Sequence, residues 1–220
     1  MKKKLKKFLS GKTFGNLLFR ETASISNEMY FISVDPRQIK YMSRIPENSV
    51  VLCGPSAKQG VYGGVWDLVK FPFEKHYLYR TVKSILKNDG LHSSPLLKKV
   101  EKGSLTEKEA KVLHDKMNRM LVKFKNEEYL SQYELEKLDQ KITIGNNRIP
   151  LHEMVVGMDR NGELMRLIGG KHRLAIAQQV GLKSMTAVLS LVHPKAVNKL
   201  PEKRRVITGA SDEDFRPFDK

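Results

Sequence analysis

Residues 164–192 read LMRLIGGKHRLAIAQQVGLKSMTAVLSLV, and their pattern predicts a strand, a tight turn, a short helix and a second strand. The first apolar run ends at Gly169-Gly170, and apolar residues then recur at helical spacing up to Gly181, where a glycine typically ends a helix. Residues 185–192 are rich in apolar and β-branched side chains, as expected of a buried strand. Strand and helix patterns combined in this way indicate an α+β protein.

The turn between the first strand and the helix has the composition of an anion-binding site. Gly169 and Gly170 can adopt positive φ and allow a ligand to approach the main chain. Lys171, His172 and Arg173 fall in the first helical turn, where the helix dipole and the N–H groups favour negative charge. Three basic residues there oppose the dipole, so we expect a phosphate-type ligand. The alternative is an ordinary strand-to-helix turn whose basic side chains face solvent.

The motif IGGKHR at 168–173, followed by LAIA at 174–177 and by Gly181, resembles the nucleotide-binding signature of the ParB/sulfiredoxin superfamily. Sulfiredoxins carry a GGCHR version that holds ATP phosphates, ParB proteins a GERR version that binds CTP, and small-molecule kinases of this fold a GxHR version. The motif matches neither the Walker A pattern nor GxGxxG. The segments WDL, PFE and YLYR between residues 66 and 80 resemble a branch of the same superfamily.

The resemblance implies a small mixed sheet with flanking helices. It is strongest over about 145–197 and weaker over about 29–86. We therefore expect one ParB/sulfiredoxin-like domain over 29–197, with a helical insertion at about 91–141. A basic N-terminal tail (1–28) and a C-terminal tail (198–220) complete the expected organisation.

The same resemblance implies a protein that binds ATP or CTP with Mg²⁺ through Gly169, Gly170, Lys171, His172 and Arg173. It further implies a phosphotransferase, kinase-like, or a nucleotide hydrolase acting on a small-molecule hydroxyl. The reactive cysteine of sulfiredoxins would stand at position 171, which is lysine here, so sulfinic-acid reductase activity is not expected. Two alternatives stay open: a DNA-associated, ParB-like nucleotide switch and a non-catalytic regulatory binding protein.

Asp67 and Glu74 are the candidate catalytic residues, because they flank an aromatic loop instead of lying on a helix face. A phosphotransferase of this fold needs a carboxylate to orient or deprotonate the acceptor hydroxyl, and often another to hold Mg²⁺. Glu74 has a second interpretation, as a simple complement to the dipole of a helix expected from Pro72 to about Lys87.

Composition limits the classes of partner and of compartment. The 220 residues include 40 Lys+Arg and 24 Asp+Glu, which gives a net charge of +16 and makes nucleic acid a possible partner. The single cysteine, Cys53, excludes an internal disulfide and favours a reducing, cytoplasmic setting. No apolar run is long enough to predict a transmembrane segment, whereas the basic N-terminus suits weak contact with a membrane surface. Oligomeric state is not predicted.

Further elements are expected from local patterns. Residues 30–34 predict a strand, and Thr106 with Glu109 forms a capping box that predicts a helix with apolar residues up to Phe124. A shorter helix is expected near Ser131, and strands over 142–149 and 153–158. The sequence Asp159-Arg160-Asn161-Gly162 predicts a hairpin turn.

Overall fold

The computed structural model describes residues 20–24, 29–45, 60–126, 129, 153–199, 204–207 and 215–216. Cys53, the helix expected near Ser131 and the strand expected over 142–149 lie outside the described residues. The weak membrane contact expected of the first residues lies outside them as well.

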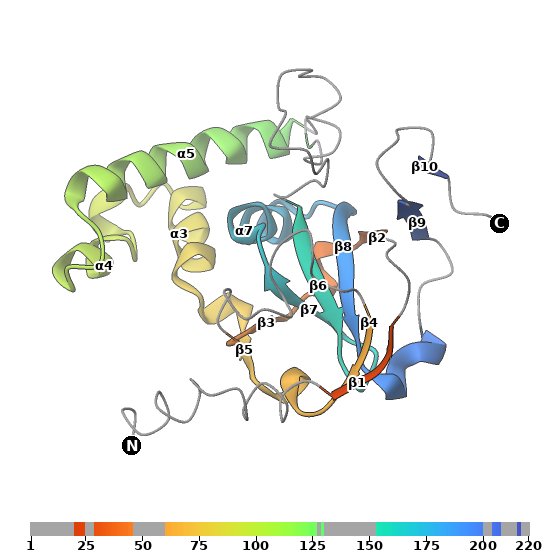
Figure 1. Cartoon of the computed structure of the whole chain (residues 1–220). Coiled ribbons are helices and arrows are strands. Elements are labelled where there is room, and N and C mark those ends of the chain that lie inside the picture. The colour runs from red at the N-terminus through yellow and green to blue at the C-terminus, as the bar shows by residue number, and fades with distance from the viewer. Residues whose placement is uncertain are drawn as a thin grey trace, which may run out of the picture.

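The described strands form one mixed sheet (Figure 1). They are β1 (Arg20–Ser24), β2 (Met29–Val34), β3 (Tyr41–Ser43), β4 (Gly60–Gly63), β5 (Lys70–Pro72), β6 (Met154–Met158), β7 (Leu164–Ile168), β8 (Met185–Val192), β9 (Arg204–Ile207) and β10 (Phe215–Arg216). The order is β10-β9-β2-β8-β6-β7-β3-β5, and the β1–β4 pair joins through β4 to the end of β8. Because β6 is parallel to β8 and antiparallel to β7, the predicted mixed sheet is confirmed.

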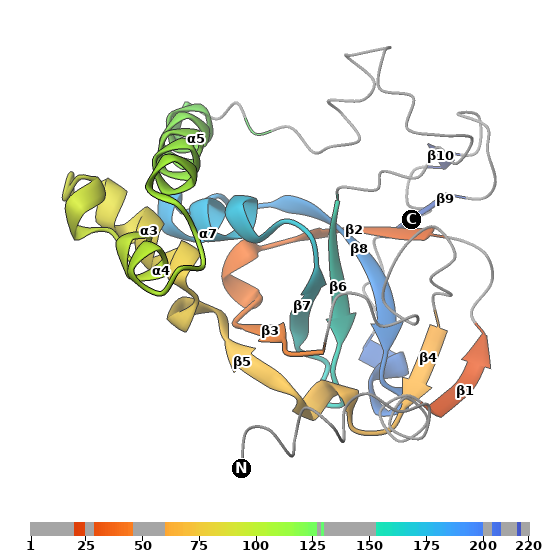
Figure 2. The same cartoon turned by 60° about the vertical axis from the view of Figure 1, so that its left-hand side comes forward.

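The α-helices lie on one side of this sheet (Figure 2). They are α3 (Tyr77–Leu86), α4 (Leu97–Glu101), α5 (Glu107–Lys125) and α7 (Lys171–Val180). Short 3-10 helices span Pro36–Gln38, Trp66–Leu68, Phe73–Lys75, Leu91–Ser93 and Pro194–Lys199. The β7–α7–β8 unit therefore forms as its sequence predicts, and so do β2, β6 and the hairpin turn, in which Gly162 N donates to Asp159 O at 2.9 Å.

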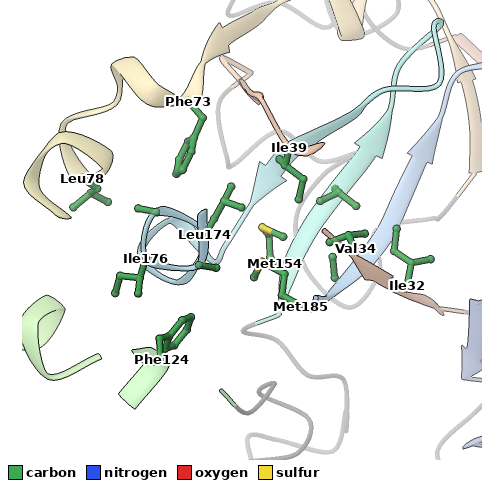
Figure 3. Close-up of a cluster of buried hydrophobic side chains, with 14 of the residues drawn as sticks. Ile32, Val34, Ile39, Phe73, Leu78, Phe124, Met154, Leu174, Ile176 and Met185 are labelled. Carbon is green, nitrogen blue, oxygen red and sulfur yellow. The ribbon is translucent and has the colours of Figure 1, made fainter. Parts of the chain in front are cut away.

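Helix α7 is packed between the sheet and the other helices (Figure 3). Leu174 faces Met154 of β6, whereas Phe124 of α5 and Leu78 of α3 cover the other sides of the helix. Leu174 is fully buried, and burying a side chain of that size contributes about 1.5–3 kcal/mol. This packing fixes both ends of α7, including residues 169–173 at its start, which we call the basic turn.

The helix expected from Pro72 begins instead at Tyr77. Pro72 is the last residue of the edge strand β5 and pairs with Tyr41 of β3, a position where a missing N–H is tolerated. Residues 73–75 form a 3-10 helix, and the Nδ1 atom of His76 caps α3 by accepting from Leu78 N at 3.3 Å. Local sequence marked the apolar stripe of this helix correctly and its start incorrectly.

The expected tails and insertion need correction. Strand β1 comes from the range expected as N-terminal tail, and β9 and β10 come from the C-terminal one, where β9 pairs with β2. Within the expected insertion, α5 begins with the predicted capping box at Thr106. Its buried residues Met117 and Leu121 belong to the same core cluster as α7, so the helix is part of the domain's main core.

Candidate anion-binding site

The chain passes from β7 into α7 through two glycines with positive φ. Gly169 has φ +67° and Gly170 has φ +60°, a region that other residues rarely adopt. A Cβ on Gly169 would lie 2.8 Å from the carbonyl oxygen of Glu153, and a Cβ on Gly170 would lie 2.6 Å from Cβ of Met154. The absence of a Cβ at these two glycines therefore allows the turn to lie against Glu153 and Met154, at the start of β6. Ligand approach, the reason expected from sequence, is not needed to explain these glycines.

The first turn of α7 points its N–H groups beyond the helix end, as every helix N-terminus does. Gly170 is the N-cap residue and has no side chain that could accept hydrogen bonds from these N–H groups. The first helical hydrogen bond runs from Leu174 N to Gly170 O at 2.8 Å. Lys171 and His172 are half-buried in this turn, so the turn is neither fully exposed nor part of the core.

Two histidines lie in this region, His172 from α7 and His76 from the start of α3. Burial is the main cause that lowers the pKa of each to about 4, and neighbouring positive charges lower both further. The cations whose charges act on them are Lys99, Lys116, Arg166, Lys171 and Arg173. Both imidazoles are therefore neutral at pH 7. Positive charge from four elements of the fold converges on the start of α7.

Arg173 occupies a different environment from the one expected. Its side chain is buried, and Nη1 donates to both carboxylate oxygens of Glu153 at 3.1 Å. Glu153 is itself fully buried just before β6. Arg173 therefore anchors the first turn of α7 to the residue that precedes β6.

Arg166 is a site residue that the sequence reasoning missed. It is 1% exposed, and its Nε donates to the carbonyl oxygen of Gly169 at 2.6 Å, which ties β7 to the turn that follows it. The available signal was an arginine in the middle of the apolar strand LMRLI. Lys99 and Lys116 gave no such signal, because lysines are common on exposed helices.

Asp67 does not lie at the basic turn. Arg160, in the hairpin turn before β7, donates to it from Nε and Nη2 at 2.7 Å and from the backbone N at 3.0 Å. The basic turn follows the other end of β7, a strand whose five residues span roughly 17 Å. Burial by itself raises the pKa of Asp67, but the hydrogen bonds and charge of Arg160 outweigh it and hold the pKa below its ordinary value. Asp67 thus holds the hairpin turn against the 3-10 helix Trp66–Leu68.

Glu74 is exposed and lines a hollow of about 380 Å³. The other lining residues are Arg37, Lys40, Tyr41, Pro72, Tyr79 and Gln178. None of the five motif residues lines this hollow, although Glu74 precedes His76 by only two residues and Gln178 belongs to α7. The expected site is thereby divided into three parts: the turn at 169–173, the hollow with Glu74, and Asp67 at the hairpin turn.

No protein-family model matches the chain, and searches of curated proteins and of solved structures found no match. The ParB/sulfiredoxin resemblance therefore stays a prediction that rests on the motif residues. Among the residues described, no helix is both long enough and apolar enough to cross a membrane.

Proposed function

We propose that this protein binds a nucleoside triphosphate, ATP or CTP, with its phosphates at the start of α7. The observation that carries the proposal is the position of Lys171 and of two half-buried histidines, His76 and His172, at the N-terminus of α7. The charges of Lys99, Lys116 and Arg166 also act on these histidines. Such an arrangement favours a ligand with several negative charges over a neutral one. The resemblance of residues 168–173 to a nucleotide-binding signature supports the same class of ligand.

Lys171, His172 and His76 are the side chains proposed to face the phosphates. Lys171 supplies a point charge, and each neutral imidazole can donate one hydrogen bond from its N–H. Because Nδ1 of His76 accepts from Leu78 N, the N–H of His76 is at Nε2. Arg166 supports the turn through Gly169 O and adds positive charge from behind it. Arg173 supports the turn through its ion pair with the buried Glu153.

We further propose phosphoryl transfer from the nucleotide to a small-molecule hydroxyl or to water. The reaction breaks the bond between the terminal phosphorus and its bridging oxygen and forms a bond to the acceptor oxygen, whose proton must be removed. Glu74 is the candidate base, because it is exposed at a hollow and precedes His76 by two residues. Asp67 does not suit this role, since Arg160 engages both of its oxygens.

The residues described do not fit a resident Mg²⁺ site. They contain no group of three or more His, Cys, Asp and Glu side chains that could hold a metal. Glu153, the carboxylate that contacts the motif, is buried and paired with Arg173. Mg²⁺ is therefore proposed only as an ion that accompanies the nucleotide, held by phosphate oxygens and water.

A non-catalytic regulatory protein is the second candidate, and the pairing of Asp67 with Arg160 favours it because one of two expected catalytic carboxylates is engaged elsewhere. Nucleotide consumption in the presence of candidate acceptors separates the two, since a purely regulatory protein binds without turnover. Glu74→Gln should then abolish turnover and leave binding unchanged if Glu74 is the base.

Isothermal titration with ATP, CTP and tripolyphosphate, each with Mg²⁺, tests the binding site. Lys171→Ala should weaken binding roughly 10- to 100-fold, because a hydrogen bond to a charged group contributes about 1.5–3 kcal/mol. Lys183→Ala, an exposed lysine beyond the other end of α7, is the matched control and should bind normally. If none of the three ligands binds, or both variants behave alike, the proposal is wrong.

A further inference from the structure

The outward face of α5 is a second basic feature, separate from the start of α7. The buried residues of this helix, Ala110, Met117, Leu121 and Phe124, face the core, so the opposite side is turned outward. Both views show α5 at the outside of the helical layer (Figures 1 and 2). The exposed cations on the outward side are Lys108, Lys111, Lys116, Arg119 and Lys123, which we call the α5 basic face.

The α5 basic face carries a marked excess of positive charge. Asp115 is the acidic residue among these positions, and it lies 3.7 Å from His114 of the same helix. Glu109 accepts from the backbone and the side chain of Thr106 in the capping box. Within the described part of the chain, none of the five cations forms an ion pair.

The spacing of these cations suits a polymer better than a small anion. From Lys108 to Lys123 the helix rises by about 22 Å, at 1.5 Å per residue. A nucleoside triphosphate can contact only one or two of them at a time. Double-stranded nucleic acid carries one negative charge per about 1.7 Å of its axis and can contact all of them together.

The residues between the cations argue against a membrane and against single strands. Val112 and Val122 are exposed, but the apolar stripe of α5 is buried against the core and cannot enter a bilayer. Single-strand binding relies on aromatic side chains that stack with bases. Phe124 is the one aromatic residue of α5, and it is buried in the core.

We propose that the α5 basic face binds the phosphate backbone of double-stranded nucleic acid without sequence preference. The net charge of +16 brings the chain toward a polyanion, and the α5 basic face supplies a row of contacts for it. This function does not depend on nucleotide binding at α7, because it uses side chains on the opposite side of α5 from the core. Lys116 is the exception, since its charge also acts on His172.

Fluorescence anisotropy with a labelled 30-base-pair duplex of random sequence, over 50–200 mM salt, tests the proposal. With about four phosphate contacts, the slope of log K against log salt should be about −3.6, which weakens binding about 150-fold across this range. A triple variant, Lys108→Glu, Arg119→Glu and Lys123→Glu, should remove most of this slope and weaken binding at least 10-fold at 50 mM salt. Lys116 stays intact, so nucleotide binding should not change.

The matched control is Lys87→Glu, Lys183→Glu and Lys195→Glu, which changes net charge equally at exposed positions outside α5. It should retain most of the affinity and most of the salt dependence. If the α5 triple variant does not unfold cooperatively, the corresponding Lys/Arg→Gln triple replaces it. The proposal is overturned if no binding occurs at 50 mM salt, or if the control weakens binding as much as the α5 variant. It also fails if phosphatidylserine vesicles bind more tightly than the duplex with the same dependence on α5.

Discussion

Replacing Gly170 with alanine should destabilise the protein more than the same change at Gly181. Both glycines border α7 and both have positive φ, +60° and +74°, so each substitution forces an alanine into the left-handed region at about 1–2 kcal/mol. The added Cβ at 181 would meet nothing within 4 Å, whereas at 170 it would lie 2.6 Å from Cβ of Met154. Displacing Met154 and the strand β6 that it begins adds an overpacking cost of about 1–3 kcal/mol.

Thermal unfolding followed by circular dichroism measures the difference between the two variants. For a chain of this size, about 1–3 kcal/mol corresponds to a further loss of roughly 2–12 °C in Tm for Gly170→Ala. Gly181→Ala should also bind nucleotide normally, because it lies at the far end of the helix. Equal losses of Tm in both variants would refute the reasoning, since the contact with Met154 would then carry no cost.

Two further predictions concern charge. Asp67→Asn should lower the free energy of unfolding by about 2–3 kcal/mol. This is less than the roughly 3–5 kcal/mol typical of a broken buried ion pair, because the Arg160 side chain is 30% exposed and partly hydrated. The pKa of Asp67 is held below its ordinary value in the folded state, so the ionised carboxylate stabilises the fold at any pH above that ordinary value. This stabilisation is lost as pH falls through the pKa of the folded state. The free energies of unfolding of wild type and Asp67→Asn, measured with urea, should therefore converge in acid. The second prediction concerns His76 and His172, whose pKa values lie at about 4 in the unliganded protein. A polyanion bound at the start of α7 should raise both pKa values. Binding should then take up protons and become tighter as pH falls from 7 toward 5. Titration calorimetry in buffers of different ionisation enthalpy measures this proton uptake. His172→Gln should reduce it. An identical uptake in wild type and variant would contradict a role for the His172 imidazole.

Much of the local structure followed from short-range pattern. The β7–α7–β8 unit, the hairpin turn and the capping box of α5 each depend on residues close in sequence, so their periodicity and capping residues predicted them correctly. The start of α3 was predicted wrongly because Pro72 suits both an edge strand and a first helical turn. Pairing with Tyr41, about thirty residues earlier, decided between the two.

The sequence by itself determined the motif, its place at a helix N-terminus and the excess of positive charge. Only the tertiary structure decided which charged groups meet. It paired Arg173 with Glu153 and Asp67 with Arg160, and it brought His76, Lys99 and Lys116 toward α7. The physical reason is that electrostatic partners depend on distances between elements far apart in the chain, which are set by core packing and sheet order and leave no periodic trace in the sequence.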